Sequence, residues 1–141
     1  MESHAPRAFV STCRALAADI ETAGLTAAIV CLPAGSNAPG SVQYYQYADA
    51  ASMNTAFGNY AGGATSGGSC SDQAGARGTY HLNSNGANIG SWACYVDTNN
   101  RSVMLWTNTN LNILSMALST TMTPQQLYNW FFYSGADPGP D

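Results

Sequence analysis

Few side chains in this sequence could carry out acid–base or nucleophilic chemistry, and they do not form a catalytic pattern. A serine hydrolase needs a histidine base beside a nucleophile, together with a carboxylate that orients the base. Only His81 of the two histidines lies inside the region that we expect to fold. Gly67–Ser71 resembles a nucleophile loop, but no Gly-x-Ser-x-Gly turn leads into a predicted helix. We therefore expect no catalytic residues, and a small secreted hydrolase is the least favoured function.

The carboxylates and cysteines do not predict a glycosidase or a metal centre either. Asp49 suits the start of a helix and Asp97 suits a polar turn, and no pair stands out among the other carboxylates for glycoside hydrolysis. A zinc site usually has closely spaced Cys and His ligands, whereas this chain contains no CxxC pair. We predict neither a metal nor a cofactor.

The four cysteines, Cys13, Cys31, Cys70 and Cys94, predict two disulfides. An even number of cysteines in a chain with few charges is typical of an oxidising compartment. Of the three possible pairings we favour the local one, Cys13 with Cys31 and Cys70 with Cys94, in which each bridge contributes roughly 3 kcal/mol. Cys70 lies in Gly62–Gly78, whose small residues cannot fill a core and which suits a loop held by a disulfide. Four buried thiols in a cytosolic protein are the alternative.

The charge composition excludes several classes of partner. Of the 141 residues 9% are charged, none is a lysine, and the net charge is −4. Because there is no basic run, binding to nucleic acid or to an anionic membrane surface is disfavoured. No apolar run approaches the length of about eighteen residues that a membrane span needs. Met1–His4 lacks the features of a signal peptide, so an extracellular location requires a signal or anchor that is missing from this sequence.

Aromatic and cationic side chains are the remaining candidates for ligand binding. Trp92, Tyr95 and Trp106 fall on neighbouring predicted strands, where exposed rings would form a platform for sugars or for a partner protein. Buried rings would instead fill a small core. Arg77 or Arg101 could anchor a carboxylate. The candidate ligand-binding residues are Trp106, Tyr95, Trp92, Arg101, Arg77 and His81.

Three helices and five or six strands would position these residues. The first helix is predicted over 8–23, where apolar residues recur at helical spacing. Asp49 can cap the second helix, and Thr123, Pro124 and Gln126 give the third helix the start of a capping box. The predicted strands cover 26–32, 41–47, 79–82, 89–96 and 102–107.

Leu111–Ser119 has an apolar face at period two, which favours a further strand, and a helix is the alternative. The element order α-β-β-α-β-β-β-β-α predicts an α+β fold: a single antiparallel sheet of about five to six strands, with three helices packed mainly on one face and two disulfides. We expect a flexible N-terminal segment at 1–7, one domain over 8–134 and a flexible tail at 135–141.

Several short motifs occur in an order that resembles a known family. They are AIVCLP at 28–33, VQYYQY at 42–47, MNTAF at 53–57, GSWACY at 90–95, VMLWTN at 103–108 and LYNWF at 127–131. With the four cysteines, this set resembles the extracellular C-terminal domain of actinobacterial membrane serine/threonine kinases and of related secreted or lipid-anchored proteins. The resemblance covers nearly the whole chain. It implies a domain outside the cell that senses or binds something, and it supplies no ligand or catalytic residue.

The favoured function is therefore a non-enzymatic extracellular sensor or ligand-binding domain of an envelope protein or receptor kinase. A concave patch that holds Trp106, Tyr95 or Arg101 would support it. The alternative is a structural or protein-interaction domain of the cell envelope, which predicts a flat aromatic or neutral polar patch and self-association, as in a homodimer. The expected partner is an extracellular small molecule, a glycan or a protein, and not nucleic acid.

Overall fold

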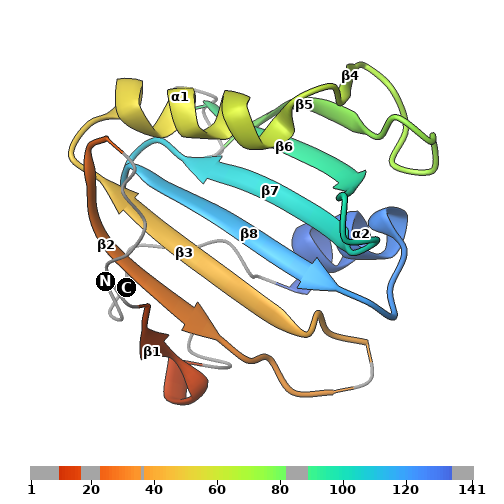
Figure 1. Cartoon of the computed structure of the whole chain (residues 1–141), viewed down its shortest axis with the longest axis horizontal. Helices are drawn as coiled ribbons and strands as arrows, with labels where there is room; N and C mark the ends of the chain where they lie inside the picture. The colour runs from red at the N-terminus through yellow and green to blue at the C-terminus, as the bar shows by residue number, and fades with distance from the viewer. Residues whose placement is uncertain (1–9, 17–22, 36, 82–88, 135–141) are drawn as a thin grey trace.

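Eight strands and two α-helices make up the part of the chain that the structure describes. The computed structural model describes residues 10–16, 23–35, 37–81 and 89–134. The strands are β1 (Arg14–Ala15), β2 (Leu25–Cys31), β3 (Ser41–Tyr47), β4 (Thr65–Ser66), β5 (Ala76–His81), β6 (Ile89–Val96), β7 (Ser102–Asn108) and β8 (Ile113–Ser119). The helices are α1 (Ala50–Ala61) and α2 (Pro124–Ser134). The strands form one sheet in the order β1-β2-β3-β8-β7-β6-β5-β4, and every pairing is antiparallel except that of β4 with β5 (Figure 1).

The α+β class is confirmed, but the predicted five to six strands and three helices are wrong. In the described part of 8–23, Val10–Thr12 forms a 3-10 helix and Arg14–Ala15 forms β1 instead of one long helix. Cys13 is bonded to Cys31, and the next residues pair with β2, so tertiary contacts override the helical spacing. The unpredicted strands β1 and β4 contain two residues each, too few to show an alternation in the sequence.

The two helices cover opposite faces of the sheet, so the prediction of helices mainly on one face is also wrong. The α1 side buries Met53 with Tyr45 and Leu105 of the sheet. The α2 side buries Leu127 with Trp106. Strands β7 and β8 are buried at every position, as expected for central strands that are covered on both faces. Both strands carry mostly apolar residues, with Ser115 and Thr107 among the polar side chains that are buried within them.

The strand prediction for Leu111–Ser119 is confirmed, and the helix alternative is excluded. This segment contains β8, which lies between β3 and β7. Leu118 near the end of β8 is opposite Ser41 at the start of β3 and Val103 near the start of β7. The pairing thus brings three distant parts of the chain together at one end of the sheet.

Both helices begin where the sequence predicts. Asp49 Oδ1 accepts the Ser52 N–H at 2.7 Å and caps α1. At the start of α2, Thr123 Oγ1 accepts the Gln126 N–H at 3.2 Å, and Gln126 Oε1 accepts the Thr123 N–H at 2.8 Å. These side chains accept hydrogen bonds from backbone N–H groups at the start of each helix, which have no acceptor within that helix. Local sequence therefore fixes both helix starts.

Both disulfides form with the predicted local pairing, Cys13–Cys31 and Cys70–Cys94. Cys31, Cys70 and Cys94 are buried in the α2-side core, and Cys13 packs against it. Gly62–Gly78 is held by Cys70 as expected, although β4 and the start of β5 also fall within it. The Cys70–Cys94 bridge thus joins a region of small residues to strand β6.

The predicted flexible ends, 1–7 and 135–141, lie outside the described residues. Among the residues that the structure does describe, no helix has the length and apolar character to cross a membrane. The described strands belong to a single sheet, and the two helices pack on its faces.

Candidate functional site

The three predicted aromatic ligand residues do not share one surface. Trp106 is fully buried in the α2-side core, where its ring centroid lies 4.7 Å from that of Phe131. Trp92 is half-buried on the same face and packs against Tyr128 with ring centroids 5.0 Å apart. Tyr95 is half-buried on the α1 side. Trp106 therefore fills the core, and the rings form no common platform.

Two more candidates, Arg77 and His81, are exposed on β5. His81 pairs with Ile89 at the start of β6, whereas the turn that carries Arg101 follows the end of β6. His81 and Arg101 therefore lie at opposite ends of the sheet and do not form one site.

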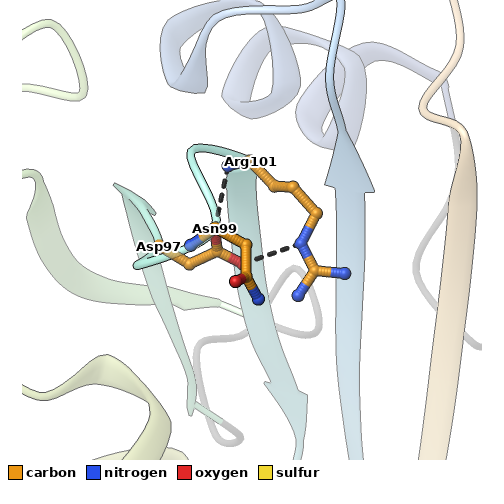
Figure 2. Close-up of polar contacts among 3 residues, drawn as sticks. All are labelled: Asp97, Asn99 and Arg101. Carbon is orange, nitrogen blue, oxygen red and sulfur yellow. Dashed lines mark hydrogen bonds and ion pairs between the residues drawn. The ribbon is translucent and has the colours of Figure 1, made fainter.

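Arg101 lies in the polar turn between β6 and β7, where Asp97 holds its side chain in place. Arg101 Nε donates to Asp97 Oδ2 at 2.9 Å, and the Arg101 backbone N–H donates to Asp97 Oδ1 at 2.8 Å (Figure 2). The Asn99 N–H also donates to Oδ1, at 3.0 Å. Asn100 adopts a φ of 60°, in the region that asparagine tolerates better than most residues, and this closes the turn.

The carboxylate of Asp97 stays ionised in this turn. Burial alone would raise the pKa of Asp97, but the hydrogen bonds from Arg101 and Asn99 and the guanidinium charge lower it more. The pKa of Asp97 therefore lies below its ordinary value. At neutral pH the turn presents a fixed ion pair, with the Arg101 side chain 41% exposed and the Asp97 side chain 17% exposed.

Arg101 also lines a hollow of about 170 Å³, which we call the Arg101 pocket. Its lining consists of Gly40, Ser41, Arg101, Leu118, Ser119 and Thr120. The start of β3 and the end of β8 meet the β6–β7 turn here, as the sheet register requires. Ser119 Oγ accepts the Thr121 and Met122 N–H groups. The hydroxyls of Ser41 and Thr120 and the terminal nitrogens of Arg101 have no hydrogen-bond partner within the described ranges.

A larger groove, of about 620 Å³, lies beside the same turn, and we call it the α2 groove. Its lining consists of Cys70, Ser71, Asp72, Gln73, Val96, Thr123, Pro124 and Gln125. Val96, the last residue of β6, immediately precedes Asp97, so the two hollows lie near the same end of β6. Asp72 is the one charged side chain that lines the α2 groove, and its Oδ2 accepts the Ser69 N–H at 2.9 Å. The Arg101 pocket therefore differs from the α2 groove in offering a cation.

Sequence reasoning identified Arg101 but missed the residues around it. The sequence predicts only a polar turn at Asp97, and the four-residue spacing from Arg101 indicates an ion pair on a helix but not in a turn. Ser41 and Thr120 approach Arg101 only because β3, β8 and β7 are neighbours in the sheet. No local pattern could have placed them together.

No known protein family, curated protein or solved structure matches this chain. The resemblance to the extracellular domains of actinobacterial kinases therefore stays a prediction. Among the described residues, no group of three or more His, Cys, Asp or Glu side chains is placed to hold a metal ion. The Arg101 pocket is thus argued from its own geometry.

Three tyrosines on the α1 side are expected to make the fold sensitive to alkaline pH. Burial raises the pKa of Tyr47 and Tyr95 to about 12 and also raises that of Tyr45, with further contributions from Asp97 near Tyr95 and from Tyr60. Unfolded tyrosines lose their protons near pH 10, so above that pH the folded state binds more protons than the unfolded state. Ionisation of these tyrosines should therefore leave the free energy of unfolding unchanged below about pH 10. It should lower this free energy as the pH rises toward 12.

Tyrosinate absorbance, measured alongside urea unfolding, tests this expectation. The folded protein should ionise part of its tyrosines at higher pH than the same protein unfolded in urea. Superimposable titration curves for the two states would contradict the expected loss of stability.

Proposed function

We propose that this chain is a non-enzymatic extracellular domain that binds an anionic ligand in the Arg101 pocket. The observation that carries the proposal is that Arg101 lines this pocket while Asp97 holds its guanidinium in place. Asp97 holds Nε at 2.9 Å, while no described residue occupies the terminal nitrogens. A guanidinium presents its N–H donors in a rigid fork that suits anionic oxygens. Because its orientation is fixed before a ligand arrives, little side-chain freedom is lost on binding.

The disulfides support the location of this domain. Two bridges indicate an oxidising environment, as outside the cell or in the cell envelope. The sequence resemblance favours the same location. A ligand of this domain would therefore be an extracellular small molecule, or an acidic group on a glycan or a protein.

Binding is favoured over the two other functions that the sequence left open. A hydrolase would need His81 beside a nucleophile and a carboxylate, and His81 is instead exposed at the end of the sheet away from the Arg101 pocket. An interaction domain predicts a flat aromatic or neutral polar patch and self-association, and an aromatic patch would gather large exposed side chains. In the described residues the most exposed of these side chains follow β2 or lie on α1, β6 and α2, and the one on α2 packs against the half-buried rings of Tyr80 and Tyr128. These exposed side chains are Leu32, Tyr60, Val96 and Phe132.

A thermal-shift panel of small carboxylates, phosphates, sulfates and acidic sugars, each with a neutral counterpart, tests the proposed function. At one hundred times its dissociation constant, a ligand adds about 2.7 kcal/mol to the free energy of unfolding. We expect stabilisation by an anion and not by its neutral counterpart. Arg101→Gln should weaken this binding about ten-fold or more, because the charged donor is lost.

The matched control is Arg77→Gln, which removes an exposed arginine from β5, away from the pocket. This variant changes the net charge by the same amount and should bind as the wild type does. If no anion in the panel stabilises the wild type, or if both variants bind equally well, the Arg101 pocket is not the ligand site.

A further inference from the structure

We infer that the Arg101 pocket selects a carboxylate over a phosphate or a sulfate, and that Asp97 is the residue that sets this selectivity. The inference rests on the proposed function, because it assigns a chemical class to the anion at the same site. It assigns Asp97 a role beyond closing the turn. Three features of the described residues support it: the free part of the guanidinium, the charge of the ion pair and the size of the pocket.

The first feature is the part of the guanidinium that remains free. An arginine can bind an anion side-on, through Nε and one terminal nitrogen, or end-on, through both terminal nitrogens. Asp97 Oδ2 already accepts from Nε at 2.9 Å, so the side-on mode is occupied (Figure 2). The end-on fork presents two parallel donors, which match the two coplanar oxygens of a carboxylate. A tetrahedral anion leaves further oxygens that must find donors elsewhere.

The second feature is the charge of the site. Asp97 and Arg101 carry opposite charges and form one ion pair, so together they have no net charge. The attraction of such a pair for an anion grows in proportion to the anion's charge, whereas the penalty for removing the anion from water grows with the square of that charge. A dianion therefore gains less relative to its desolvation penalty than a singly charged anion does. A singly charged carboxylate has the more favourable balance.

The third feature is the size and lining of the pocket. A volume of about 170 Å³ corresponds to that of roughly six water molecules in the liquid, enough for a carboxylate and the few carbon atoms attached to it. Leu118 offers an apolar contact for those carbons. Ser41 and Thr120 line the same hollow, and a serine or threonine hydroxyl can donate to a carboxylate oxygen. The expected ligand is thus the carboxylate end of a molecule whose remainder lies outside the pocket.

The test is a titration of the protein with sodium acetate, sodium phosphate and sodium sulfate at constant ionic strength and neutral pH, followed by the NMR signal of the Arg101 Nε–H. This proton is donated to Asp97 and therefore reports directly on the pocket. We expect acetate to shift the signal saturably, and phosphate and sulfate to bind about five-fold more weakly or worse. In Asp97→Asn, which keeps a side-chain oxygen for the turn but removes the charge, this preference should fall toward equal binding or reverse.

Asn99→Ala is the matched control, because Asn99 contacts Asp97 through its backbone N–H and not through its side chain. It should retain the wild-type preference. Dispersed amide spectra show whether each variant is folded. The wild-type comparison of acetate with phosphate needs no variant, so the selectivity can be refuted even if Asp97→Asn does not fold.

The outcomes separate this inference from the proposed function. If no anion shifts the Arg101 signal, the proposed function itself is wrong. If phosphate or sulfate binds the wild type as tightly as acetate, the pocket binds anions but the selectivity is wrong. An unchanged preference in folded Asp97→Asn would show that Asp97 does not set the selectivity.

Two larger carboxylates test which kind of molecule carries the carboxylate. Glucuronate carries it on a sugar and N-acetylalanine carries it on a peptide end, and the one that binds more tightly than acetate identifies the class of ligand. Weaker binding of both than of acetate would contradict a pocket that accepts one end of a larger molecule.

Discussion

Removal of the Cys70–Cys94 disulfide is expected to lower the free energy of unfolding by about 3.5 kcal/mol. The two cysteines are 24 positions apart, and the bridge reduces the conformational entropy of the unfolded chain by an amount that grows with this separation. Both cysteines are also buried in the α2-side core, so their loss removes packing as well. For a domain of this size the expected loss is a large part of the total stability.

This bridge is important because the segment around Cys70 has few other contacts with the core. Between α1 and β5 most residues are exposed, and the buried ones are Ala64, Cys70 and Gly75. Small side chains bury little apolar area, so they contribute little hydrophobic free energy. The disulfide therefore supplies most of what holds this segment against β6.

The measurement is urea unfolding of the double variant Cys70→Ala/Cys94→Ala beside the wild type. The double variant Cys13→Ala/Cys31→Ala is the comparison, because it removes a bridge over a similar separation of 18 positions, on the same face but near the opposite edge of the sheet. Both should be destabilised, but only the first should expose the segment that carries Cys70 to proteases under native conditions. A loss below about 1 kcal/mol for the first would contradict the entropic argument.

The parts of the fold that depend on residues close together in the sequence could be predicted. Asp49 and Thr123 cap their helices through contacts three residues away, and the period-two pattern of Leu111–Ser119 identified a strand. The local pairing of the cysteines was also correct. Each of these features joins residues no more than 24 positions apart in the chain, which is why a single sequence can indicate it.

The parts that depend on which strands become neighbours could not be predicted. Helical spacing in 8–23 suggested a helix, yet Arg14–Ala15 pairs with β2. The burial of both faces of β7 and β8 required a helix on each side, whereas the element order suggested a single layer of helices. The candidate site follows the same rule. Arg101 could be proposed as a carboxylate anchor from its type, but its pocket exists only because β3, β8 and β7 are adjacent.

Gly75→Ala is the second substitution with a large expected effect, and it acts on the same segment as the Cys70–Cys94 bridge. Gly75 has a φ of +74°, a conformation that alanine adopts only with strain. A Cβ atom at this position would overlap the carbonyl oxygen of Cys94 and would lie 2.9 Å from Cβ of Tyr95. Because the obstruction includes backbone in a paired strand, no side-chain rotation relieves it. Strain and overlap together are expected to lower the free energy of unfolding by about 3 kcal/mol.

Two other glycines provide controls for this prediction. A Cβ atom at Gly63 or at Gly58 would meet nothing within 4 Å, and neither residue has a positive φ. Gly63→Ala should be close to neutral, and Gly58→Ala, inside α1, should raise the free energy of unfolding by about 0.5–1 kcal/mol. Urea unfolding of the three variants under one set of conditions measures the contrast. If Gly75→Ala resembles Gly63→Ala, then the close approach of this segment to β6 is wrong.

The same variant also separates the two hollows beside the β6–β7 turn. Gly75 follows the segment that lines the α2 groove, and its N–H donates to the Asp72 carbonyl at 3.0 Å. A displacement at Gly75 therefore moves Asp72 and its neighbours, whereas none of the residues that line the Arg101 pocket belongs to that segment. Folded Gly75→Ala protein should consequently keep the acetate response of the Arg101 Nε–H. Loss of this response in protein that remains folded would show that the two hollows are coupled through the turn, and would contradict a ligand site that depends on the Arg101 pocket alone.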